Sequence, residues 1–265
     1  MKTILLINDD GIHSVGLLAL KKKLERFGKV TIAAPLDEKS GIGKALSTSS
    51  IKVAETILGD STKAYAVAGT PADAYLLAVN KIMKESPDLL VAGINLGPNL
   101  CIDDLLNSGT LGAALEAAIH HVPAIAVSYC LREITEQMRE KADVSVDELE
   151  VAATLAEKTA EYVLEHGMPK NVDIISINVP ERATLKNAEV TKLSYKGYDD
   201  IHVKQGDAYR IKGWILSSYP DDKNGTDLYA VKTKGHVSIT PIKVNFEHDT
   251  KSLEELRNFL VAEET

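Results

Sequence analysis

Short apolar runs alternate with segments of helical periodicity over the first two thirds of the chain. The runs are Thr3–Ile7, Lys29–Ala34, Pro87–Ile94, Pro123–Tyr129 and Val172–Val179, and each has the continuous apolar character of a strand buried on both faces of a sheet. Helices are predicted between them at Val15–Phe27 with Gly28 as C-cap, Ala74–Met83, Leu111–Val122 and Leu149–Leu164. This alternation predicts an α/β fold, with a Rossmann-like, mostly parallel sheet and helices on both faces.

The pattern changes after residue 185. Ala188–Tyr195, Asp207–Ser217 and Ala230–Asn245 alternate between apolar and polar residues, which predicts a smaller antiparallel section with an extended hairpin arm. A helix over Lys251–Leu260 is expected to close the chain. We therefore divide the sequence into an α/β core that carries the chemistry (residues 1–185) and a section of antiparallel hairpins and a C-terminal helix (residues 186–265), which packs on the core and serves oligomerisation.

The predicted arm, Asp207–Asn245, has no obvious helix to cover it. An isolated hairpin is marginal in water, and an unpaired strand edge invites pairing with another chain. We therefore expect a homodimer or a tetramer held through this arm. Trp214 and Tyr219 are candidate anchors of the interface, although a single Trp is more often simply part of a core.

Composition narrows the class of protein. The chain has 265 residues, of which 45% are hydrophobic, and this is enough for a full core. A net charge of −8 argues against nucleic acid as a partner, because such binding needs a basic surface. Cys101 and Cys130 make no disulfide framework, which favours a reducing compartment. No apolar run approaches the ~20 residues of a membrane span, and the first run is too short for a signal peptide. We expect a cytoplasmic protein with no membrane partner.

Two adjacent carboxylates follow the first apolar run. Asp9 and Asp10 stand directly after it, before Gly11, and ligands of open α/β sheets bind outside the carboxyl ends of the strands. Side by side the two groups repel each other, so a cation is needed to keep both ionised. Oxygen ligands without His or Cys suit Mg²⁺, Mn²⁺ or Ca²⁺. The alternative is a polar turn, for which Asp-Gly is a common dipeptide.

Three further segments place polar or small residues at the same edge of the predicted sheet. Asn95 ends the Pro87–Ile94 run, and its amide oxygen can complete a hard-metal shell without adding charge. Ser40 and Gly41 lie in the loop after the second run and offer a hydroxyl and an unshielded N–H. Ser108-Gly109-Thr110 opens a predicted helix, where free backbone N–H groups can bind an anion. Helix capping alone also explains this last segment, as it explains Thr70-Pro71 before Ala74–Met83.

These motifs occur in a known order. They are Ile7–Gly11, Ser40-Gly41, Gly69–Asp73, Gly93–Asn99, Ser108–Thr110, Asn178–Pro180, Thr226-Asp227 and Gly235–Pro241. In sequence and spacing they resemble the SurE family, and the resemblance extends from Leu5 to about Pro241. The region Arg132–Val146 contributes least to it.

The resemblance implies a metal-dependent phosphomonoesterase, a 5′-nucleotidase or acid-type phosphatase that hydrolyses nucleoside 5′- and 3′-monophosphates with metal-activated water. It implies one divalent ion per subunit, Mg²⁺ or Mn²⁺ with Ca²⁺ as a substitute in crystals. The implied ligands are Asp9, Asp10, Ser40 and Asn95, of which Asp9, Asp10 and Asn95 are the candidate catalytic residues. The implied phosphate-binding residues are Asn8, Gly41, Ser108, Gly109 and Thr110. It also implies a homodimer whose C-terminal arms reach across to the neighbouring subunit.

Three other classes of protein share some of these features. A phospho-receiver domain needs an Asp at the end of a later strand, where this chain has Asn95. Phosphatases of the haloacid-dehalogenase type require Asp-x-Asp after the first strand, whereas here the two acids are adjacent. A non-catalytic nucleotide-binding module remains open, as do the preferred base, the 5′ or 3′ position, the metal and the use of polyphosphate.

Overall fold

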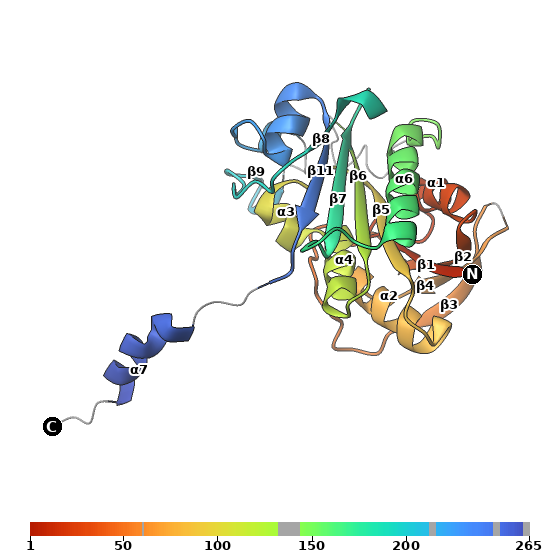
Figure 1. Ribbon diagram of the computed structural model, residues 1–265, viewed down its shortest axis with the longest axis horizontal. Coiled ribbons are helices and arrows are strands. Elements are labelled where there is room, and N and C mark those ends of the chain that lie inside the picture. Colours follow the sequence, from red (N-terminus) through yellow and green to blue (C-terminus); the bar gives the residue numbers. More distant parts are fainter. Residues whose placement is uncertain (60, 132–143, 212–215, 246–249, 262–265) are drawn as a thin grey trace.

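The computed structural model describes residues 1–59, 61–131, 144–211, 216–245 and 250–261. Nine of the described strands form one sheet (Figure 1), in the spatial order β3 (Val53–Ile57), β4 (Lys63–Val67), β2 (Gly28–Pro35), β1 (Lys2–Ile7), β5 (Leu89–Leu96), β6 (Ala124–Cys130), β7 (Ile174–Pro180), β11 (Val237–Ile242) and β8 (Ala188–Val190). The six strands from β4 to β7 are parallel, whereas β3 and β11 pair antiparallel with β4 and β7. The predicted α/β fold with a mostly parallel sheet is confirmed.

Both faces of the sheet are covered, because successive side chains of a strand point to opposite sides. In β1, Ile4 and Leu6 belong to the core under the helices α1 (Val15–Leu24) and α6 (Glu150–His166). Leu5 and Ile7 belong to a second core under α2 (Pro71–Leu77) and α4 (Gly109–Ile119). All four β1 side chains are completely buried, which explains the continuous apolar run in the sequence.

Two helix starts follow their predicted caps. Thr70 accepts a hydrogen bond from the Asp73 backbone N–H, and the Asp73 carboxylate accepts one from the Thr70 backbone N–H, so the pair forms a capping box at α2. Ser108 caps α4 by accepting from the Leu111 N–H. The α2 helix is shorter than predicted, because Ala78–Met83 continues it as a π-helical segment.

Two expectations in the first half of the chain are wrong. The helix α1 ends at Leu24 with Glu25 as its C-cap, and Gly28 instead begins β2, where a Cβ would lie 2.0 Å from the Lys2 carbonyl oxygen. A strand packed this closely against its neighbour tolerates only glycine there. The segment between Asn99 and Ser108, for which no helix is predicted from the sequence, contains α3 (Cys101–Asn107), whose first turn carries two acidic residues.

The C-terminal section differs more from the prediction. The hairpin β9 (His202–Gln205) and β10 (Ala208–Ile211) is a separate two-stranded sheet. Ala230–Lys234 is π-helical rather than extended, and this segment, Tyr229–Lys234, ends where Gly235 takes a φ of 66°. β11, within Asp207–Asn245, joins the main sheet, so that segment is not one continuous arm.

Of the two candidate interface anchors, the structure describes Tyr219. Tyr219 is 2% exposed and belongs to a buried cluster of its own chain that also contains Leu100 and Leu228, so it is part of a core. Trp214 lies outside the described residues, as does most of the charged segment Arg132–Val144. By contrast α7 (Glu254–Val261) lies apart from the body of the protein in Figure 1, and every one of its residues is exposed. None of the helices in the described ranges is long and apolar enough to cross a bilayer.

Candidate active site

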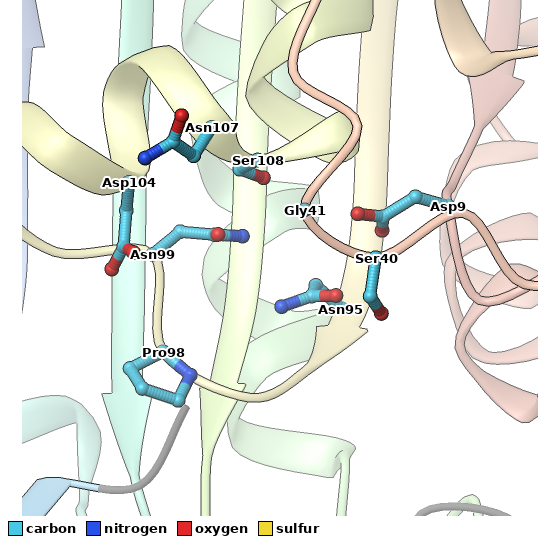
Figure 2. A pocket seen from close by; sticks show the side chains of 9 residues that line it. All are labelled: Asp9, Ser40, Gly41, Asn95, Pro98, Asn99, Asp104, Asn107 and Ser108. Carbon is cyan, nitrogen blue, oxygen red and sulfur yellow. The ribbon is translucent and has the colours of Figure 1, made fainter. Parts of the chain in front are cut away.

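The central strands β1 and β5 are neighbours, but the chain leaves them toward opposite sides of the sheet, to β2 and to β6. Ligands of open α/β sheets bind at such a switch point, outside the carboxyl ends of the strands. Asp9 follows β1 and Asn95 lies near the end of β5. Figure 2 shows both side chains beside Ser40 around one space, and Ser108 lies at its far side. The predicted meeting of these residues at one sheet edge is therefore observed.

Asp9 is a buried carboxylate, only 4% exposed. Its Oδ1 accepts a hydrogen bond of 2.5 Å from the Thr110 hydroxyl. Its backbone carbonyl accepts from the Lys39 N–H at 2.7 Å, which ties the β1 loop to the Ser40 loop. Thr110 is fully buried and is not among the residues that line the pocket, so its hydroxyl orients Asp9 without facing the pocket itself. The predicted role of Thr110 at a phosphate can involve its backbone N–H, while its side chain serves Asp9.

Asp10 and Asn95 are both anchored to β5 and the loop after it. Asp10 Oδ2 accepts from the Leu96 N–H at 3.2 Å, and Asp10 lines an adjacent pocket together with His13. The Asn95 amide nitrogen donates to the Gly97 carbonyl at 2.8 Å. This bond turns the amide oxygen of Asn95 toward the side where Asp9 and Ser40 lie (Figure 2).

Ser40 and Gly41 line the pocket from the loop that follows β2. The Ser40 hydroxyl donates to the Glu38 carboxylate at 2.5 Å. Because its proton is directed to Glu38, its oxygen can act as an acceptor or a metal ligand. Gly41 has a φ of 68°, in the left-handed region that favours glycine, and this bends the loop around the pocket.

The start of α4 borders the pocket through its N-cap, Ser108. Ser108 lines it and is 7% exposed, while Gly109 and Thr110 occupy the first two helical positions. Backbone N–H groups at these positions have no partner within a helix, and they carry the positive end of the helix dipole. Ser108 therefore has two roles, as the cap of α4 and as a pocket wall.

Asn8 is completely buried. Its amide nitrogen donates to the Gly11 carbonyl at 3.1 Å, and its amide oxygen has no hydrogen-bond partner among the described residues. Asn8 therefore shapes the Asp9–Gly11 loop from within. Its predicted contact with phosphate stays a prediction.

Sequence reasoning missed Asn99, Asn107 and Asp104, which also line the pocket. Asp104 is 2% exposed and accepts hydrogen bonds from the Leu100 N–H and from the hydroxyls of Tyr198 and Tyr219. Burial raises the pKa of Asp104 to about 7, and these three donors oppose that rise. One feature of the sequence could have identified Asp104: two acids stand inside the apolar stretch Cys101–Leu106, a pattern that is typical of a helix rather than of a loop.

The pocket is acidic. Among the described residues that line it there are two carboxylates, Asp9 and Asp104, and no Lys, Arg or His. A phosphate monoester is itself anionic, so its binding beside Asp9 and Asp10 calls for a cation. No group of three His, Cys, Asp or Glu side chains gathers within the described ranges, and the candidate ligands beside Asp9 in the pocket are the neutral oxygens of Ser40 and Asn95. Carboxylate, hydroxyl and amide oxygens together fit a hard divalent ion such as Mg²⁺ or Mn²⁺.

Comparisons with known proteins agree on one family. The family model described as "Survival protein SurE" matches residues 4–200. Proteins named 5′-nucleotidase SurE are similar along most of their length: that of Methanosarcina acetivorans is 38% identical over 246 residues, 91% of this chain and 92% of its own. That of Methanococcus maripaludis strain C6 is 40% identical over 261 residues, 96% of each chain. The crystal structure of the Sure protein from Aquifex aeolicus superimposes with a TM-score of 0.73 at 28% identity, covering 97% of this chain and 99% of that one.

Proposed function

The chain belongs to the SurE family, and from that premise we propose that it is a 5′-nucleotidase, a phosphomonoesterase that hydrolyses nucleoside monophosphates to nucleoside and phosphate. The observation that carries the proposal is the convergence of Asp9, Ser40 and Asn95 on one pocket that Ser108, the N-cap of α4, also lines. Hydrolysis of a phosphate monoester mainly needs neutralisation of charge and a positioned water. This pocket combines a set of cation ligands with a cluster of anion-binding N–H groups.

Asp9, Asp10, the Ser40 hydroxyl oxygen and the Asn95 amide oxygen would hold one divalent ion, Mg²⁺ or Mn²⁺. When bound, such an ion neutralises phosphoryl charge and lowers the pKa of a bound water. Thr110 keeps the Asp9 carboxylate in place, and the Gly97 carbonyl keeps the Asn95 amide in place. Glu38 holds the Ser40 proton away from the pocket.

The phosphate would lie against the start of α4. The backbone N–H groups of Gly109 and Thr110, the N–H of Gly41 and the Ser108 hydroxyl supply neutral donors to its oxygens. Attack by water forms one P–O bond and breaks the bond to the nucleoside oxygen, which leaves with a proton. Neutral donors suit this step. They stabilise the charge that spreads over the phosphoryl oxygens, and they form no ion pair that would retain the phosphate product.

The test is release of inorganic phosphate from a panel of nucleoside 5′- and 3′-monophosphates, with Mg²⁺, Mn²⁺ or a chelator. We expect turnover that the chelator abolishes and that Asp9→Asn lowers by at least about 100-fold, in parallel with weaker metal binding. Asp88→Asn is the matched control, since the Asp88 carboxylate also accepts a hydrogen bond from a threonine hydroxyl, that of Thr3 at 3.1 Å, but lies before β5 at the opposite sheet edge. Binding of nucleotide without turnover would instead identify a non-catalytic module.

We also propose that two copies associate through the section formed by residues 186–265. The exposed apolar side chains of α7, together with the exposed hairpin β9–β10, support this proposal. We propose a cytoplasmic location because Cys101 and Cys130 are both free and buried, as is usual in a reducing compartment.

A further inference from the structure

Three consecutive backbone N–H groups beside the candidate active site each donate to a side chain from a different element. The Asn99 N–H donates to Asn178 Oδ1 at 2.8 Å, where Asn178 is on β7. The Leu100 N–H donates to Asp104 Oδ2 at 2.6 Å, on α3. The Cys101 N–H donates to Asp227 Oδ2 at 3.0 Å, just before the π-helical segment Tyr229–Lys234.

The three acceptors are themselves fixed. Asn178 is completely buried and also donates to the Asn99 carbonyl at 2.9 Å, so it holds both polar groups of that residue. Asp227 is 1% exposed, and its Oδ1 accepts from the N–H groups of Ser194 and Leu228, each at 2.8 Å. Buried polar groups of this kind are costly unless every partner is present, so they define one arrangement of the backbone.

A second contact supports the role of Asp104. Its carboxylate also accepts from the hydroxyls of Tyr198 and Tyr219, both of which belong to the C-terminal section. The same section supplies Ser194, whose carbonyl accepts from the Ile102 N–H at 2.8 Å. Side chains and backbone groups of the C-terminal section therefore hold the start of α3 and the loop before it, through Ser194, Tyr198, Tyr219 and Asp227.

The segment Asn99–Cys101 needs such support because its backbone conformation is unusual. Cys101 has a φ of 60°, in a region unfavourable for a residue with a side chain. A strained residue persists only where its surroundings hold it, and the Cys101 N–H is held by Asp227.

The same loop shapes the pocket. Pro98 and Asn99 line it directly, and the Gly97 carbonyl orients the amide of Asn95, a proposed metal ligand. A shift of this loop would therefore move the Gly97 carbonyl and, with it, the Asn95 amide that is proposed to bind the metal.

We infer that Asn178, Asp104 and Asp227 are positioning residues for the phosphatase reaction, and that they act by fixing the backbone of Asn99–Cys101. The inference rests on the proposed function. It assigns a role in the reaction to two motifs, Asn178–Pro180 and Thr226-Asp227, that touch no proposed substrate. It also gives the C-terminal section two roles: it supports the active site, and it serves the proposed association of two copies.

Asp227→Asn tests this assignment. The amide keeps one oxygen for the Ser194 and Leu228 N–H groups and turns its NH₂ toward the Cys101 N–H, so only the bond to the loop is lost. Asp173→Asn is the matched control: Asp173 accepts from the Val244 N–H at 2.8 Å and from Lys243, but it precedes β7 at the opposite sheet edge. The first readout is hydrogen exchange of metal-free protein over Leu96–Asp104, and the second is phosphate release as a function of Mg²⁺ or Mn²⁺.

In Asp227→Asn we expect amide exchange over Leu96–Asp104 to rise about tenfold, as for a lost hydrogen bond. We also expect kcat/KM to fall about 10- to 100-fold and the metal concentration for half-maximal activity to rise. Asp173→Asn should show none of the three changes. If Asp227→Asn does not fold, Tyr219→Phe applies the same test, because it removes one donor from Asp104 and should change each readout in the same direction.

Unchanged exchange over Leu96–Asp104, or a loss of activity no larger than in Asp173→Asn, would overturn the inference. A wild-type protein that releases no phosphate from any nucleoside monophosphate would instead refute the proposed function. The exchange comparison needs no substrate, so it decides the positioning of the loop in either case.

Discussion

Gly109, at the first position of α4, lies in contact with Asp9 of the β1 loop. A Cβ on Gly109 would be 2.8 Å from the Asp9 Cβ, 3.0 Å from Asp9 Oδ2 and 3.0 Å from the Lys39 carbonyl oxygen. The helix start can approach the carboxylate this closely only because residue 109 has no side chain. The anion-binding and cation-binding halves of the proposed site are therefore packed directly against each other.

Gly109→Ala should displace Asp9 from the pocket. A misplacement of about 1 Å at a reacting centre costs about 100-fold in rate, and we expect a loss of that order in kcat/KM. Gly59→Ala is the control, since a Cβ there meets nothing within 4 Å. Steady-state kinetics of both variants at saturating metal check the prediction. Equal activity of Gly109→Ala and Gly59→Ala would contradict the proposed position of Asp9.

Ser108→Ala separates the capping role of Ser108 from its proposed role as a donor to phosphate. Loss of the cap on the Leu111 N–H should lower the free energy of unfolding by about 1 kcal/mol. Loss of a donor to phosphate should also raise KM and weaken inhibition by inorganic phosphate. Thr70→Ala, which removes the cap of α2, should lower stability by a similar amount and leave both kinetic quantities unchanged. Chemical denaturation and product-inhibition assays measure the two effects, and a Ser108→Ala protein that differs from wild type only in stability would leave the residue as a cap alone.

The parallel core and the edge where the site forms could be predicted from the sequence, because both depend on local pattern. The run Thr3–Ile7 is apolar on both faces because both are buried, and parallel strands bring Asp9 and Asn95 to one edge. The prediction of Gly28 as a helix C-cap is wrong, because a glycine that follows a helical pattern can be either a C-cap or a site of close contact between strands. The approach of the Lys2 carbonyl that decides between them is made by a neighbouring strand.

The positioning residues of the site could not be predicted from local sequence pattern. Asp104, Asn178 and Asp227 lie far apart in the sequence and meet only where β7, α3 and the C-terminal section converge. Asn178 and Asp227 stand in motifs that carry the family resemblance, but their own segments do not indicate which groups they bind, and Asp104 looks like an ordinary polar residue. What distinguishes them is burial together with backbone partners, and both are properties of the folded chain.

The buried carboxylate of Asp104 should make stability depend on pH. Burial raises its pKa from 3.8 to about 7, so between these values the native state binds a proton that the unfolded state has released. Stability therefore falls as the pH rises from about 4 to about 7, by up to about 4 kcal/mol from this group, and does not change further above that range. Asp104→Asn should flatten the curve. Urea denaturation of metal-free wild type and variant at several pH values measures the difference, and parallel curves would show that Asp104 is ionised throughout.

The helix α7 leads to a prediction about assembly. Leu256, Phe259 and Leu260 are 50%, 80% and 69% exposed and occupy positions i, i+3 and i+4, so they form one apolar face. A helix of this length is not stable alone in water, and an apolar face without cover favours association. We expect a dimer by light scattering at micromolar concentration, and dissociation toward monomer in the double variant Leu256→Lys, Phe259→Lys. The control, Glu254→Gln with Asn258→Lys, adds the same charge on the opposite face and should remain dimeric. A monomeric wild type, or a double variant that keeps the dimer mass, would exclude α7 from the interface.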